Sequence, residues 1–264
     1  MHYHFLDPYR PGGSVLHALD ARVKFILSVA FILAVALTPA GAWPIYVLLL
    51  ALAVALAVAS ELGTTYALKR ALIALPFALA ALPSLFTLPG AALFSLHIGP
   101  WTLTATGPGL ERLLSVVLKS WISMQAAILL TATTQFPDLL VAMRAIKVPR
   151  LLVAIFGLMW RYLFVLVDEA IRLTRARDAR SGSLTGRGGR SVWWRARVTG
   201  GMAGNLFLRG YERGERIYAA MAARGYDGEV RAFPLPSLAP GQAALLIGGL
   251  VSLAALTLLG IWLW

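Results

Sequence analysis

The stretch LLVAIFGLMWRYLFVLVDEAIRLTRARDAR, Leu151–Arg180, reads as one long helix with two different halves. Its first half is apolar except for Arg161, whereas its second half, from Asp168 onward, is charged. Apolar residues favour the bilayer or its interface, and a densely charged helix requires water. We therefore predict that this helix leaves the membrane or its interface and projects into the cytoplasm.

The segment around this helix, Thr131–Gly241, carries most of the positive charge of the chain. It holds 17 of the 24 Lys and Arg residues, while four apolar runs precede it and one follows it. A basic segment of this size cannot lie in the hydrocarbon core. We expect a cytoplasmic platform that acts on, or is acted on by, the membrane part of the protein.

The composition is typical of a membrane protein. Of the 264 residues, 59% are hydrophobic and 14% are charged, whereas roughly 25% are charged in soluble domains. Five apolar runs approach the ~20 residues that cross a bilayer: Val23–Leu37, Trp43–Ala59, Ala71–Leu88, Leu113–Leu130 and Gln242–Trp264. Helices are the open elements that satisfy their own backbone there.

These runs predict an all-α, polytopic membrane protein with about five transmembrane helices and a cytoplasmic helical coupling region. Residues 1–130 would contain the N-terminal transmembrane helices, 131–241 the cytoplasmic coupling helices and 242–264 a C-terminal transmembrane helix. The third run, Ala71–Leu88, contains Pro76 and Pro83 and is followed by Pro89. Each proline removes a helical hydrogen bond, so we expect this run to be kinked or broken.

The distribution of Lys and Arg predicts the orientation. Basic residues cluster before the first span and between the second and third: Arg10, Arg22, Lys24, Lys69 and Arg70. The opposite loops, Thr38–Ala42 and Pro89–Gly109, contain no Lys or Arg. Because basic loops stay in the cytoplasm, we expect a cytoplasmic N-terminus and an external C-terminus. Basic residues gathered on the cytoplasmic side meet anionic lipid, so the net charge of +12 requires no nucleic acid.

Lys119 is the exception among spans with uncharged interiors, and it aligns at helical spacing with Arg112, Ser115 and Ser123. Two interpretations are open. The row is a polar seam for a substrate or a partner helix, or Lys119 snorkels or faces other helices of this chain. The scarcity of intramembrane charge argues against an ion pathway formed by this chain alone.

Candidate metal ligands are few. The chain has no cysteine, which excludes disulfides, thiolate metal sites and a cysteine nucleophile. His2 and His4, together with the α-amino group, have the chemistry to bind cobalt or nickel. They belong to a free terminus on the cytoplasmic side, and we favour an exposed tail over a metal site.

The basic segment is predicted to be helical, with helices at Leu139–Lys147, Leu151–Arg180 and Asn205–Arg224. The last helix should end at Gly225 in a left-handed cap. The connector Ser181–Ser191 is rich in glycine, but no Walker pattern occurs in the chain. We therefore expect that this chain does not hydrolyse nucleotide itself.

Two tripeptides end the charged helices: Ala179-Arg180-Ser181 and Ala223-Arg224-Gly225. Paired Ala-Arg-Gly-like tripeptides at helix tips resemble those of the transmembrane T component of energy-coupling factor (ECF) transporters. Three longer stretches are similar to its cobalt subgroup, the CbiQ-like proteins: LDARVKFILSVAFILAVALTP, the run from Thr131 to Arg180, and NLFLRGYERGERIYAAMAARGYDGEVR. The first tripeptide departs from the pattern because Ser181 replaces glycine.

The resemblance implies a non-catalytic subunit of an ATP-driven importer, with no cofactor of its own. Each tip would rest on one of two ATP-binding subunits, which hold the ATP. Their motion would pass to a membrane S component that binds the metal ion, and a small accessory membrane subunit is a further candidate partner. The opposing interpretation is that Arg180 and Arg224 are ordinary helix-end cations favoured by the helix dipole.

Other functions remain to be weighed. A self-contained membrane carrier would need polar groups near mid-span, and a membrane-bound enzyme would need clustered carboxylates or histidines. Asp168-Glu169 is the one acidic pair near the interface, and salt bridges with Arg172 and its neighbours explain it better. The carried substrate is expected to be cobalt, with nickel or a vitamin as alternatives, because selectivity would reside in a partner.

Overall fold

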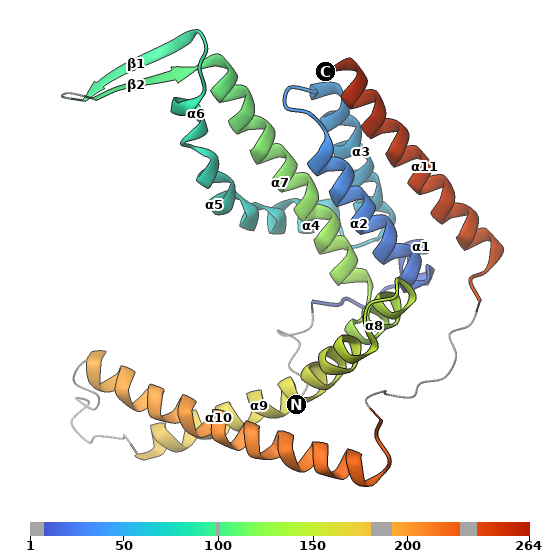
Figure 1. Ribbon diagram of the computed structural model, residues 1–264, viewed down its shortest axis with the longest axis vertical. Helices are drawn as coiled ribbons and strands as arrows, with labels where there is room; N and C mark the ends of the chain where they lie inside the picture. The colour runs from blue at the N-terminus through green and yellow to red at the C-terminus, as the bar shows by residue number, and fades with distance from the viewer. Residues whose placement is uncertain (1–7, 99–100, 181–191, 228–236) are drawn as a thin grey trace. The chain divides into compact units, whose positions relative to one another are not determined.

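The computed structural model describes residues 8–98, 101–180, 192–227 and 237–264, which form helices and one β-hairpin (Figure 1). These residues belong to two compact units. One comprises Ile146–Pro234, and the other comprises His2–Ala145 together with Leu235–Trp264. The predicted class, a polytopic helical membrane protein, is confirmed.

The larger unit is built around helix α7, Gly107–Thr133. Helices α2 and α3 pack against α7, and α11 packs against α2, so the four run alongside one another in Figure 1. The other helices of this unit outside the broken third run are α1 (Val15–Ala18), α2 (Ala21–Leu37), α3 (Trp43–Ala59), α8 (Phe136–Ala145) and α11 (Pro240–Leu263).

The core of this unit forms where α2, α3, α7 and α11 meet. Its largest buried members include Phe31, Val35, Leu49, Ile122 and Leu253. The same helices are also apolar on their outer faces, where Val47 and Ile247 are 65% and 63% exposed. A helix that is apolar all round and still exposed belongs in lipid, because lipid covers the outer face at no cost.

Three described helices are long and apolar enough to cross a membrane: α7, α9 (Arg150–Arg180) and α11. A bent pair, Thr65–Ala74 with Leu79–Thr87, would make a fourth span. The sequence predicts about five spans and counts two further runs, which form α2 and α3. Each of these helices has 17 residues, at the short end of the spanning range. Helix α9, by contrast, satisfies the length and composition of a span although the sequence assigns it to the coupling region.

The proline-rich third run is broken, as predicted. It folds as short pieces whose two parts differ in direction by 44°. Pro76 and Pro83 lie in this region, where each lacks the N–H that a continuous helix needs. The pieces are α4 (Thr64–Ala71), η1 (Leu72–Ala74), α5 (Leu75–Ala78), η2 (Leu79–Ala81) and α6 (Ser84–Thr87).

The loop predicted between Pro89 and Gly109 contains an antiparallel β-hairpin, β1 (Ala92–Ile98) and β2 (Trp101–Thr106). The last residue of β2, Thr106, directly precedes α7. The Thr106 hydroxyl donates to the Leu88 carbonyl oxygen at 2.9 Å and accepts from the Gly109 N–H at 3.3 Å. Thr106 therefore caps α7 and holds the hairpin against the broken run. The alternating threonines of WTLTAT were the available signal for a strand.

The smaller unit contains α9 and α10, Val192–Ala223. Helix α9 has the predicted extent to within one residue. Helix α10 begins at Val192, well before the predicted start at Asn205. The added part contains three glycines, Gly200, Gly201 and Gly204. Each costs about 1 kcal/mol relative to alanine, which weakens a helix without ending it.

Candidate functional site

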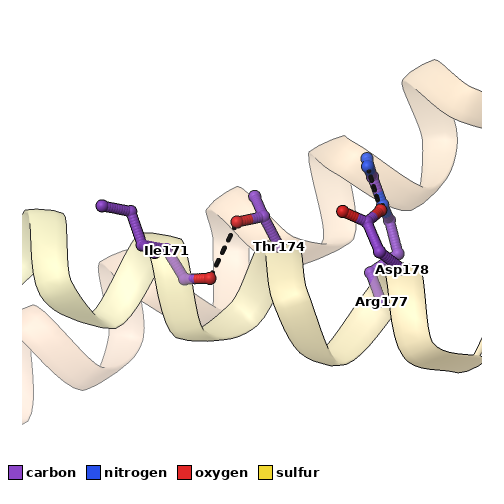
Figure 2. Close-up of polar contacts among 4 residues, drawn as sticks. All are labelled: Ile171, Thr174, Arg177 and Asp178. Carbon is purple, nitrogen blue, oxygen red and sulfur yellow. Dashed lines mark hydrogen bonds and ion pairs between the residues drawn. The ribbon is translucent and has the colours of Figure 1, made fainter.

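Several polar groups near the end of α9 make contacts along the helix itself. Figure 2 shows the Thr174 hydroxyl donating to the Ile171 carbonyl oxygen at 2.8 Å. It also shows Arg177 Nη2 paired with Asp178 Oδ1 at 2.6 Å. These local contacts need no neighbouring element. The helix can therefore carry its charged end into solvent without losing hydrogen bonds.

Arg180 is the last residue of α9, and both it and Ala179 are exposed. No ion pair within the described residues involves Arg180. Ser181, the third member of the predicted tripeptide, lies outside the described residues. A cation at a helix C-terminus is stabilised by the helix dipole. The geometry thus presents a guanidinium at an exposed helix end.

The second tip ends α10, and Ala223, Arg224 and Gly225 are all exposed. The predicted left-handed cap is confirmed, with φ of 79° at Gly225. The Gly225 N–H donates to the Ala222 carbonyl oxygen, and the Tyr226 N–H donates to that of Met221, both at 3.0 Å. This pair of bonds is a Schellman motif.

Glycine is required at position 225 by its backbone angle rather than by space. A Cβ there would meet no atom within 4 Å, whereas positive φ strains other residues. The cap ends α10 at Ala223 and turns the chain away after Arg224. Arg224, like Arg180, has no ion-pair partner in the part of the chain that the structure describes.

Helices α9 and α10 are joined at a crossing formed by a charge pair and a small residue. Arg209 Nη1 of α10 binds Glu169 Oε1 of α9, and Arg172 Nη2 lies 3.3 Å from Glu169 Oε2. Next to Arg209, a Cβ on Gly210 would come within 3.3 Å of Leu166 Cδ2. The helices therefore approach closely where Glu169 holds them together.

The salt bridge predicted between the acidic pair and Arg172 is confirmed for Glu169. Its second partner, Arg209, was missed because the two residues are 40 positions apart and meet only in the folded unit. Gly200 and Gly204, two small residues that can permit a close helix contact, have no atom within 4 Å of a Cβ placed on them. Between the described parts of α9 and α10, the close approach is at Gly210.

Lys119 binds the end of a neighbouring helix. Its ammonium group donates to the carbonyl oxygen of Thr38 and, at 3.3 Å, to that of Ala36, at the C-terminal end of α2. One turn earlier, Ser115 Oγ accepts from the Gly41 N–H at 3.2 Å. Of the two interpretations of the polar row, the structure favours a contact between helices of this chain.

The opposite end of the α2–α7 pair is closed in the same way. Lys24, near the start of α2, donates to the carbonyl oxygen of Thr133 at the end of α7 at 2.9 Å. Each helix of this pair thus supplies a lysine to the unpaired carbonyl groups at the end of the other. The buried Lys24 and the half-buried Lys119 both have structural partners, which accounts for their presence next to apolar spans.

No group of three or more metal-ligating side chains occurs among residues 8–98, 101–180, 192–227 and 237–264. His2 and His4 lie outside these ranges, so the preference for an exposed tail stays a prediction. The described residues therefore offer helix tips, a helix crossing and membrane helices as functional features.

Comparisons with known proteins give one consistent result. A family model for the cobalt transport protein CbiQ matches residues 12–234. The chain is similar to the cobalt transport protein CbiQ of Rhodobacter capsulatus, with 32% identity over 67% of this chain and 69% of that protein. It is similar to the energy-coupling factor transporter transmembrane protein EcfT of Thermosediminibacter oceani, with 26% identity over 97% of this chain and 98% of that protein. The chain is also similar to the nickel permease LarQ of Lactiplantibacillus plantarum, with 31% identity over 46% of this chain and 41% of that protein.

Proposed function

The chain belongs to the CbiQ family of cobalt transport proteins, T components of ECF transporters, and we propose that it couples two ATPase subunits to metal uptake. Members of this family are non-catalytic transmembrane subunits. One observation carries the proposal. Two helices of one unit cross at Glu169 and Arg209, and each ends in an exposed arginine.

The two tips suit a contact with a protein partner. A guanidinium stays charged at any relevant pH and binds a carboxylate or two carbonyl groups through its planar fork. Alanine and glycine beside Arg224, and alanine beside Arg180, leave that fork accessible to a groove. We assign Ala179, Arg180 and Ser181 to one ATPase contact and Ala223, Arg224 and Gly225 to the other.

The crossing would convert ATPase motion into motion of the membrane part. When the two ATPase subunits close on ATP, the tips that they hold change their separation. Because Glu169 and Gly210 fix the helices to each other, this change alters the crossing instead of separating the helices. The S component in the membrane would receive that change and release the metal ion. ATP would be bound entirely by the partners.

Cobalt is the proposed substrate, because the matching family model and the Rhodobacter relative both name cobalt. Nickel is the second candidate, since a nickel permease is also similar to this chain. The S component would decide between them. A small accessory membrane subunit would complete the assembly.

We further propose that residues 131–241 act on the cytoplasmic side of a bacterial inner membrane, with the N-terminus also cytoplasmic. The Lys and Arg distribution supports this orientation, because 17 of 24 basic residues fall in that segment. In this arrangement both arginine tips can reach cytosolic ATPases.

Co-purification tests the assignment. The tagged chain, expressed with its candidate ATPase and S subunits, should recover all of them in one complex. The Arg180→Glu and Arg224→Glu variants should each weaken recovery of the ATPase subunits while retaining the S component. A matched control is Arg216→Glu, which reverses an exposed charge on α10 away from the tips. Equal ATPase recovery with wild-type, tip and control proteins would refute the tip assignment.

A further inference from the structure

The first turns of α10 expose an unusual combination of large apolar side chains. Val192 and Trp193 are 84% and 80% exposed, and the adjacent Trp194 is 46% exposed. Three consecutive large apolar residues facing water are rare on a soluble surface and mark a contact with something apolar. The function proposed above gives them no role. Arg224 lies at the other end of α10, and Arg180 ends α9, separated from the start of α10 by residues 181–191.

Arginine flanks this apolar turn in the sequence. Arg195 and Arg197 are exposed in the same turns of α10. Between Asp178 and Glu212 the sequence has no Asp or Glu, but it has six arginines: Arg180, Arg187, Arg190, Arg195, Arg197 and Arg209. The later part of α10 differs, because Glu212 and Glu215 alternate there with Arg213 and Arg216. The sequence around the start of the helix is thus basic and contains no acidic residue, unlike the later part.

We propose that Val192–Arg197 docks on the anionic headgroups of the bilayer surface. Tryptophan rings settle at the headgroup level, where one part of the ring is apolar and the N–H remains hydrated. Arginine beside them is attracted to negatively charged lipid. An acidic protein surface would match the arginines, but it would leave three large apolar side chains without an apolar partner. Anionic lipid matches both features at once.

This contact would hold the start of α10 at the surface of the bilayer. It is independent of the coupling role, because it uses neither Arg180 nor Arg224. Failure of the lipid contact would leave ATPase binding by the tips untouched, and the reverse holds as well. The two proposals are therefore distinguishable by separate measurements.

Spin labelling can test the contact, because the chain has no native cysteine. Ala196→Cys places a nitroxide one turn after Val192 and keeps the three apolar residues and both arginines. Ala219→Cys is the matched control, being an exposed alanine later on the same helix. Both full-length proteins are reconstituted into vesicles of phosphatidylcholine alone, or with about one third phosphatidylglycerol. Collision of the label with a water-soluble nickel chelate and with oxygen is then measured.

With phosphatidylglycerol, the label at position 196 should collide several-fold less with the nickel chelate and more with oxygen. The label at position 219 should not respond. Removing both charges by Arg195→Gln and Arg197→Gln should abolish the lipid dependence, and high salt should weaken it. The same charge loss by Arg213→Gln and Arg216→Gln should leave it intact.

Three results would overturn the inference. The label at position 196 could be equally accessible to the nickel chelate in both lipids. Its lipid dependence could survive loss of Arg195 and Arg197. It could also be protected solely when the ATPase subunits are added, which would assign the surface to a protein partner.

Discussion

Arg180 and Arg224 are the side chains to which we assign the ATPase contacts, and two explanations of them make different predictions. As ordinary helix-end cations they would contribute ~0.3–1 kcal/mol through the helix dipole, and lysine would serve as well as arginine. As contacts with ATPase subunits they would need the planar fork, which lysine lacks. Both are exposed, so neither explanation predicts a large effect on folding.

Replacing either arginine by glutamate should lower ATPase affinity strongly while changing the free energy of unfolding by no more than about 0.5 kcal/mol. Charge reversal leaves the partner group unpaired, at roughly 2–5 kcal/mol of binding free energy. Lysine should give an intermediate affinity. Titration of the purified chain with ATPase subunits measures this directly. If lysine matches arginine and glutamate costs only a little stability, the helix-dipole explanation is correct.

Lys119 gives a contrasting prediction, because its partners are carbonyl groups of this chain. Lys119→Met should lower the free energy of unfolding of the detergent-solubilised protein by roughly 1.5–3 kcal/mol, the contribution expected of hydrogen bonds from a charged donor. Thermal unfolding measures this change. Lys119→Arg should retain most of this contribution. The folded Met variant should still transport metal when assembled with its partners. Unchanged stability with lost transport would instead support the polar seam for a substrate.

At the scale of the element, the crossing of α9 and α10 is the feature that we propose transmits motion. Glu169→Gln and Arg209→Gln, made singly and together, should give a coupling energy of roughly 0.2–1 kcal/mol, because Arg209 is largely exposed. Each single variant should also reduce the metal transported per ATP hydrolysed while leaving ATPase binding intact. Additive stability effects with wild-type transport per ATP would show that the crossing is incidental.

The helices themselves were largely predictable. The extent of α9 followed from Pro149 just before it and from the glycine-rich connector that begins at Ser181. The broken third run followed from Pro76 and Pro83, and the end of α10 followed from Gly225. Local chemistry decides each of these, so a sequence suffices.

Features that depend on distant residues were not predictable. The Glu169–Arg209 pair and the bond from Lys119 to the end of α2 join residues 40 and 81 positions apart. The start of α10 was misplaced for a different reason. A glycine costs about 1 kcal/mol relative to alanine and does not by itself end a helix, so α10 continues through Gly200 and Gly204. The hairpin was missed because glycine and proline on both sides masked the alternation of its second strand.

At the scale of the molecule, orientation is the first property to test. Ala219→Cys in α10 and Phe94→Cys in β1 replace exposed residues on segments that we place on opposite sides of the membrane. An impermeant thiol reagent added to intact cells should label position 94 and spare position 219. Both should react after the membrane is opened, which controls for reactivity. The reversed pattern would mean that the coupling helices lie outside and cannot meet cytosolic ATPases.

ATP-dependent metal uptake into proteoliposomes is the most direct test of the coupling role. Radioactive cobalt should accumulate only when the chain, two ATPase subunits, the S component and ATP are all present. Vesicles with the chain alone should accumulate none. The complex with Arg180→Glu and Arg224→Glu should lose uptake, and a complex with Arg216→Glu should keep it. Cobalt accumulation by the chain alone, or wild-type uptake with both tips reversed, would contradict a role as the coupling subunit.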